Sequence, residues 1–212
     1  MRRYIFIFVI IALFGGSLLH AQESVEQYLL SLEDPTKEDY INLLYEGSHE
    51  NMVLALTKLA PMAESGDEEL FDALIFGLEQ GTFYIKRKGN RVVNDFWDVR
   101  AASAVALGEM GDPDALPHLY MALRYDPDSY VRSEVAVAIG KIGEPSAIPM
   151  LERTIETSSA AGPDDGVVLG CVVALGEIGH RDGFVPLLEV MRGRYRRSIR
   201  RAARESLKKI KW

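Results

Sequence analysis

The chain has 212 residues, a length that suits one domain or a small array of repeats, and a formal net charge of −7. Apolar residues make up 48% of it, an ordinary share for a globular protein, so the chain can bury a core. Its single cysteine, Cys171, excludes an intramolecular disulfide and a cysteine-based zinc site. Cys171 lies in an apolar helical run, where a small buried residue is a better interpretation than a thiol that pairs with a partner chain.

The first 21 residues have the layout of a secretory signal peptide. Arg2 and Arg3 form a positive start, and an almost wholly apolar run follows over residues 4–19. We expect cleavage after Ala21. Leu19, the third residue before this site, is larger than the small residue that is preferred there. The run is short for a spanning helix, which needs about 20 apolar residues, and an uncleaved anchor is the alternative. No comparable apolar segment follows, so we expect no transmembrane helix after cleavage, and a periplasmic or secreted protein.

Residues 22–96 form a divergent helical region before the repeats described below. Thr36 is a predicted N-cap with Asp39 three positions on, and Gly66 and Asp67 form a predicted turn between two helices. We expect a terminal cap of two helices and then a degenerate helical hairpin. The expected helices lie near Val25–Leu32, Lys37–Tyr45, Asn51–Glu64 and Glu68–Glu79.

An insertion follows these helices, at Thr82–Asp95. Residues 82–85 and 91–93 are rich in β-forming side chains and flank a turn signal at Gly89. We therefore predict a small β-hairpin or an ordered loop. The insertion carries four of the twelve basic residues of the otherwise acidic body, Lys86, Arg87, Lys88 and Arg91.

Three similar segments begin at Val99, Val131 and Val167, and a fourth, shorter copy begins at Ile199. The first helix of each unit shows apolar residues on one face, and a glycine that suits a left-handed C-cap follows it. Stacking of such hairpins buries faces that no single hairpin could cover, which predicts a solenoid. A polar loop over 157–166 accounts for the longer second spacing, of 36 residues against 32. The matched glycines are Gly108, Gly140 and Gly176, then Gly111, Gly143 and Gly179.

The pattern over residues 97–191 resembles HEAT repeats of the short type named after phycobilisome lyases. The resemblance implies an all-α, right-handed α-α solenoid that usually binds other proteins, and a minority of the family attaches or isomerises bilins. The first-helix arginine of the family is present as Arg100, Arg132 and Arg200, whereas Val168 stands there in the third unit. We divide the chain into a signal peptide (1–21), a divergent cap with the inserted loop (22–96), and repeats with a basic capping helix (97–212).

Charge is distributed unevenly along the chain. Residues 22–191 carry a net charge of −18, and residues 192–212 carry +9. The basic segment predicts a final amphipathic helix. Its cations either form a merely solvated outer face, offset the acidic body of the same chain, or form a contact surface for an anionic partner. Export makes nucleic acid an improbable partner. The candidate cationic residues here are Arg196, Arg197, Arg200, Arg201, Arg204 and Lys208.

Sequence patterns for catalysis or metal binding are not evident. The chain has no phosphate-binding glycine loop, no nucleophile elbow and no zinc-protease motif. His49, His118 and His180 lie in different repeats or loops, so we expect no metal site, no cofactor and no enzymatic activity. Helix capping explains acidic pairs such as Asp126 and Asp128 better than calcium binding does.

These patterns favour a non-enzymatic interaction or scaffold module of a bacterial envelope. We expect a protein partner on the concave face of the solenoid, lined by second helices. A peripheral envelope binder that uses the basic helix and the 86–91 loop is one alternative, and a bilin-lyase accessory is another, weaker one. The candidate partner-binding residues are Tyr120, Arg124, Arg153, Glu156 and Glu189.

Overall fold

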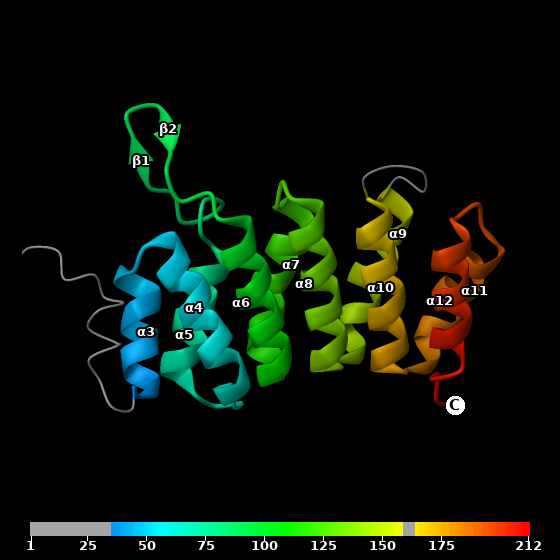
Figure 1. Cartoon of the computed structure of the whole chain (residues 1–212). Coiled ribbons are helices and arrows are strands. Elements are labelled where there is room, and N and C mark those ends of the chain that lie inside the picture. The colour runs from blue at the N-terminus through cyan, green and yellow to red at the C-terminus, as the bar shows by residue number, and fades with distance from the viewer. Residues whose placement is uncertain (1–34, 159–163) are drawn as a thin grey trace, which may run out of the picture.

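The computed structural model describes residues 35–158 and 164–212, so the signal peptide and the helix expected at Val25–Leu32 lie outside the described residues. Half of the loop expected at 157–166, residues 159–163, does so too. Helices dominate the described part of the chain (Figure 1). They are α3 (Lys37–Glu46), α4 (His49–Leu59), α5 (Glu68–Leu78), α6 (Trp97–Met110), α7 (Leu116–Tyr125), α8 (Ser129–Ile142), α9 (Ile148–Thr157), α10 (Asp165–Ile178), α11 (Phe184–Arg192) and α12 (Arg197–Leu207).

The helices form a stack of antiparallel hairpins, which confirms the predicted all-α solenoid (Figure 1). The first helices α6, α8, α10 and α12 pack side by side in one layer. Each second helix packs against the first helix that follows it in the chain: α7 against α8, α9 against α10, and α11 against α12. Short 3-10 turns precede α7, α9 and α11, at Pro113–Ala115, Pro145–Ala147 and Arg181–Gly183.

The ends of the helices follow the sequence signals. Gly111, Gly143 and Gly179 all adopt left-handed backbone angles after a first helix, with φ of 69°, 81° and 62°. At these positions a glycine avoids the steric cost that a Cβ would bring. The predicted capping box of Thr36 and Asp39 begins α3, and the Asp67 side chain accepts a hydrogen bond at the start of α5.

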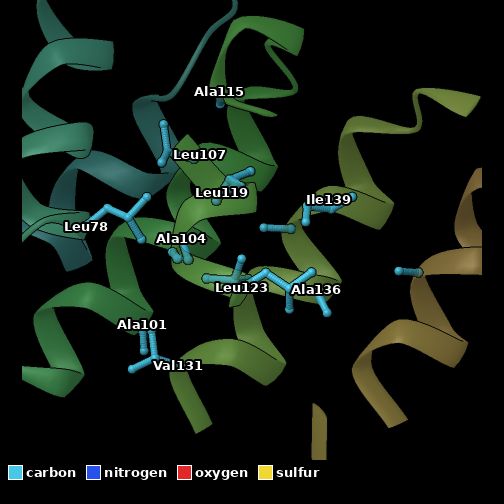
Figure 2. Close-up of a cluster of buried hydrophobic side chains, with 14 of the residues drawn as sticks. Leu78, Ala101, Ala104, Leu107, Ala115, Leu119, Leu123, Val131, Ala136 and Ile139 are labelled. Carbon is cyan, nitrogen blue, oxygen red and sulfur yellow. The ribbon is translucent and has the colours of Figure 1, made fainter. Parts of the chain in front are cut away.

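The core is a continuous layer of Leu, Ile, Val and Ala side chains between the two layers of helices (Figure 2). Leu107 of α6, Leu123 of α7 and Ile139 of α8 are all fully buried. Because each repeat contributes to the next one's core, removing one leucine here creates a cavity that costs about 2–5 kcal/mol.

The first helices approach one another closely at glycine. A Cβ added to Gly108 would lie 2.7 Å from the Cα of Ala138, and one added to Gly140 would lie 2.5 Å from the Cα of Ala174. Both distances are shorter than any normal contact to backbone, so the alanine and glycine of the repeat are required by the spacing of these helices.

We therefore expect Gly140→Ala to destabilise the protein by about 1–3 kcal/mol, because overpacking against backbone outweighs the better helix propensity of alanine. The measurement is the free energy of unfolding in urea, followed by circular dichroism. Gly166→Ala is the matched control, because the nearest atom to its added Cβ is 3.9 Å away. The control should be neutral or slightly stabilising, and an equal loss in both variants would contradict the close approach of α8 and α10.

Candidate functional site

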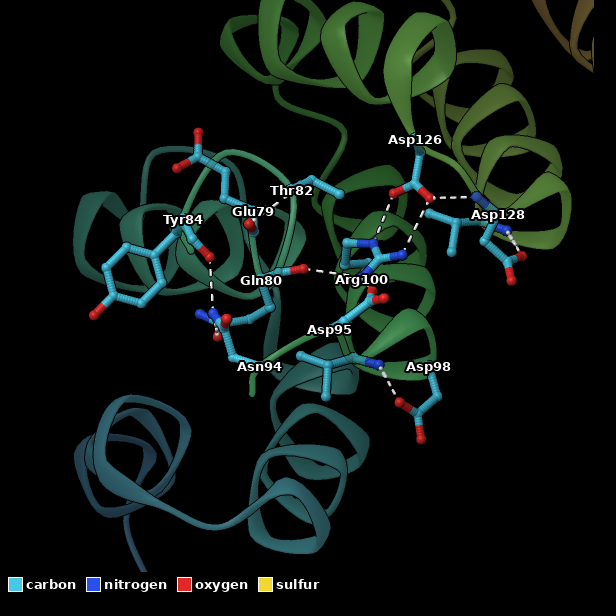
Figure 3. A network of polar contacts seen from close by, with 12 residues as sticks. Glu79, Gln80, Thr82, Tyr84, Asn94, Asp95, Asp98, Arg100, Asp126 and Asp128 are labelled. Atoms are coloured by element: carbon cyan, nitrogen blue, oxygen red, sulfur yellow. Dashed lines mark hydrogen bonds and ion pairs between the residues drawn. The ribbon is translucent and has the colours of Figure 1, made fainter. Parts of the chain in front are cut away.

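A buried ion pair lies within the first full repeat, and its arginine also binds the base of the inserted hairpin (Figure 3). The Arg100 guanidinium of α6 donates to both carboxylate oxygens of Asp126, over 2.7 and 3.2 Å. Both side chains are only 1% exposed. A further nitrogen of Arg100 donates to the carbonyl of Gln80 and to Asp95. Burial acts to lower the pKa of Arg100, but the bonds to Asp126 and Asp95 outweigh it and raise this pKa.

The base of the insertion is held by a buried amide. The Asn94 side chain donates to the side chain of Gln80 and to the carbonyl of Tyr84, and it accepts from the backbone of Lys86 over 2.8 Å. Asn94 and Gln80 are 2% and 1% exposed. Since Arg100 also binds Gln80, the hairpin is anchored to α5 and α6 through hydrogen bonds that water cannot easily replace.

The predicted β-hairpin is present within the insertion. Strands β1 (Arg87–Lys88) and β2 (Arg91–Val92) pair antiparallel around Gly89, and they project from the stack (Figure 1). Lys88 lies directly opposite Arg91 in the register. All four basic residues of the insertion are exposed, and none forms an ion pair with a carboxylate of the described residues.

The five candidate partner-binding residues lie on three successive second helices. Tyr120 and Arg124 are on α7, Arg153 and Glu156 on α9, and Glu189 on α11. All are exposed except Tyr120, which is half-buried, and burial raises its pKa. The structure therefore distributes these residues along one row of helices and brings only Glu156 and Glu189 to a common hollow.

That hollow lies between α9 and α11 and has a volume of about 330 Å³. Three carboxylates line it, those of Glu152, Glu156 and Glu189, together with the ring of Tyr195. Burial and the nearby charges of Glu156 and Glu189 raise the pKa of Tyr195. Arg194 also lines the hollow, yet none of the three carboxylates has an ion-pair partner within the described chain.

Helix α12 confirms the predicted amphipathic segment, with Ile199 and Ala203 buried on its inner side and Ile210 buried just after its end. Its cations fall into two groups. Arg196 pairs with Asp165 and Lys208 with Glu205, so these two are already partnered. The other four arginines are exposed, have no ion-pair partner among the described residues, and line a hollow of about 420 Å³ beside Met191: Arg197, Arg200, Arg201 and Arg204.

The two cationic surfaces are separate. The hairpin stands near the α6 end of the stack, and α12 lies at the other end (Figure 1). The two groups of cations therefore do not form a single patch.

One surface was not predicted from the sequence. Phe83, Met121 and Tyr125 are 44%, 46% and 54% exposed and line a shallow hollow at the base of the hairpin. The signal available was the spacing of Met121 and Tyr125, four residues apart on the side of α7 away from the buried leucines. His118 lines a neighbouring hollow with Phe83 and Met121, and the Glu79 carboxylate, 3.6 Å from His118, lines it too.

The remaining candidates show structural roles. His49 hydrogen-bonds Asp98 over 2.7 Å and stacks on Phe96, joining α4 to α6. Cys171 is fully buried, and desolvation raises the pKa of its thiol to about 12. Such a thiol is held in its unreactive, protonated form at neutral pH. Over residues 35–158 and 164–212, no cluster of His, Cys, Asp or Glu could hold a metal ion, and no helix could cross a membrane.

Comparisons with known proteins agree with this architecture. Residues 90–162 match the family model for HEAT repeats. The fold is similar to a chain in the structure of the complex of CpcE and CpcF of phycocyanin lyase from Nostoc sp. PCC7120, with a TM-score of 0.62 and 24% identity. The match covers 85% of this chain and 67% of that one. None of the curated proteins matches.

We expect Arg100→Met to lower the free energy of unfolding by about 3–5 kcal/mol, because it leaves the Asp126 carboxylate buried without its counter-charge. Arg100→Met combined with Asp126→Leu should recover part of this loss. Urea denaturation of the two single variants and the double variant gives the coupling energy. Arg153→Met, at an exposed position on α9, is the control and should change stability by less than about 0.5 kcal/mol. Strictly additive losses would show that the pair is not coupled.

Proposed function

We propose that this protein is an exported, non-enzymatic interaction module that binds a protein partner through its second-helix face, the row formed by α7, α9 and α11. The observation that carries the proposal is the hollow between α9 and α11. Glu152, Glu156 and Glu189 converge there around Tyr195, and they outnumber the one cation, Arg194, that lines the same hollow and pairs with none of them. Unpaired carboxylates beside an aromatic ring favour a lysine or arginine side chain of a partner, which could both pair with the carboxylates and stack on the ring.

The comparisons support a binding role in a general way. HEAT repeats present extended surfaces formed by successive units, and stacked repeats commonly use such surfaces to bind other proteins. The similar solved chain belongs to a complex of two proteins. Its lyase activity would require a bilin site here, and no observation on these residues favours one.

A second candidate function is binding of an anionic envelope surface through α12. The four arginines around Met191 favour it, because they outnumber the one carboxylate, Glu205, that lines the same hollow, and a bound anion would offset their mutual repulsion. Attraction of this kind weakens steeply as salt rises, because exposed charges are screened over about 8 Å at physiological ionic strength.

Export is tested by the mass of the protein recovered from its source. We expect the tagged chain in the soluble envelope fraction, with a mass that corresponds to a first residue of Gln22. Recovery of the intact chain in the membrane fraction would instead identify residues 1–21 as a retained anchor. Recovery from the cytoplasm with its N-terminus intact would reject export.

The binding face is tested by affinity capture from envelope extract with the purified protein as bait. We expect Glu156→Arg with Glu189→Arg to reduce capture of a specific partner by about tenfold or more, since charge reversal replaces attraction by repulsion. Glu46→Arg with Glu64→Arg makes the same change in charge elsewhere on the surface and should leave capture unchanged.

The same experiment separates the two candidate functions. If capture survives the variant of α9 and α11 but is lost with Arg200→Glu and Arg204→Glu, and also in high salt, α12 is the binding surface. If all variants capture the same proteins, the second-helix face is not the contact.

A further inference from the structure

Exposed apolar side chains gather around the base of the hairpin. Of the fifteen large apolar side chains that are exposed in the described chain, nine lie in the insertion or on the helices next to it. Large apolar patches at the surface of a soluble protein mark sites of interaction. The nine are Phe83, Tyr84, Ile85, Val92, Val93, Trp97, Met121, Tyr125 and Tyr130.

Two hollows join into one groove at this place. One has a volume of about 220 Å³ and lies between α5 and α7, and the other has about 620 Å³ and extends past Tyr125 to Pro127. Phe83 and Met121 line both hollows, so they form the common wall between them. Aromatic and methionine side chains are the residues enriched at the centres of protein interfaces.

Unpaired cations lie on the hairpin, whose base lines this groove, and at the edge of the groove beside Tyr125. Lys88 and Arg91 face each other directly across the hairpin, an arrangement of like charges that destabilises a strand pair. Lys86 lies 5.4 Å from the ring of Tyr84, and Arg124 lies 5.2 Å from the ring of Tyr125. None of these four has a carboxylate partner in the described residues, although the body of the protein is acidic.

The order of apolar and basic residues along the hairpin distinguishes between a lipid bilayer and a protein segment as the binding partner. A hairpin that inserts into a bilayer needs an apolar tip with cations behind it, at the headgroups. Here the cations lie at the tip, in β1 and β2, and the apolar groove lies behind them at the base (Figure 1). The buried hydrogen bonds of Asn94 to Gln80 and Tyr84 fix this arrangement.

We propose that the groove and the hairpin above it form a docking site for a segment of a partner protein that combines apolar and acidic side chains. The apolar side chains pack between Phe83, Met121 and Tyr125, and the carboxylates pair with Lys88, Arg91 and Arg124. The proposal shares with the proposed function the premise of a protein partner, but it concerns a different surface with a preference for the opposite charge.

Fluorescence anisotropy with short labelled peptides tests the site. One set of peptides combines Leu or Phe with Asp and Glu, a second replaces the acids by Lys, and a third replaces the apolar residues by Ser. We expect the first set to bind about tenfold more tightly than either other set, because only it satisfies both the groove and the cations. Binding should weaken as salt rises.

Variants of the protein locate the binding. Met121→Ser should weaken binding of the first set of peptides about tenfold, because it removes the shared wall of the groove. Lys88→Glu with Arg91→Glu should weaken this binding by a similar factor, because it reverses the charge. Val185→Ser and Arg181→Glu are the controls, at exposed positions on and before α11. Circular dichroism should show all variants folded, as each changed side chain is exposed.

Three results would overturn the proposal. They are equal binding of all peptide sets, equal weakening by the controls, and hairpin-dependent binding to phosphatidylglycerol vesicles in place of peptides. Glu156→Arg with Glu189→Arg separates this site from the proposed function. This variant should reduce partner capture by about tenfold or more without weakening the binding of the acidic peptides. The two proposals can therefore fail independently of each other.

Discussion

The buried pair of Arg100 and Asp126 is the interaction on which the arrangement of the surfaces depends. It connects the start of α6 to the end of α7, and through Gln80 it reaches the end of α5 and the base of the hairpin (Figure 3). A charge buried to this extent is tolerated only with a full set of partners. The network that joins α5, α6 and α7 therefore also fixes the base of the hairpin, which lines the apolar groove.

The equivalent arginine of the next unit shows how position in the stack changes this role. Arg132 donates to the carbonyl of Leu123 and pairs with Asp164 over 3.3 Å, but its side chain is 21% exposed. Arg200, in the last unit, is exposed and has no carboxylate partner in the described chain. The same repeat position thus holds a buried, ion-paired arginine in the first unit and an exposed arginine without a carboxylate partner in the described part of the last unit.

The surfaces of the protein are chemically different from one another. The hollow between α9 and α11 is acidic, the face of α12 is basic, and the insertion carries cations on its hairpin and lines an apolar groove at its base. A stack of repeats separates such surfaces because each unit contacts only its neighbours, so each surface can be altered with little effect on the others.

The sequence by itself determined the repeat, the helical hairpins, the glycine caps and the position of the β-hairpin, because these depend on local periodicity and backbone conformation. It also placed the basic face of α12, which is continuous in the chain. The apolar groove required the tertiary structure, since Phe83 and Met121 meet only when the insertion folds against α7. The distinction between paired and unpaired cations had the same origin, because Asp165 reaches Arg196 only through the packing of the last two repeats.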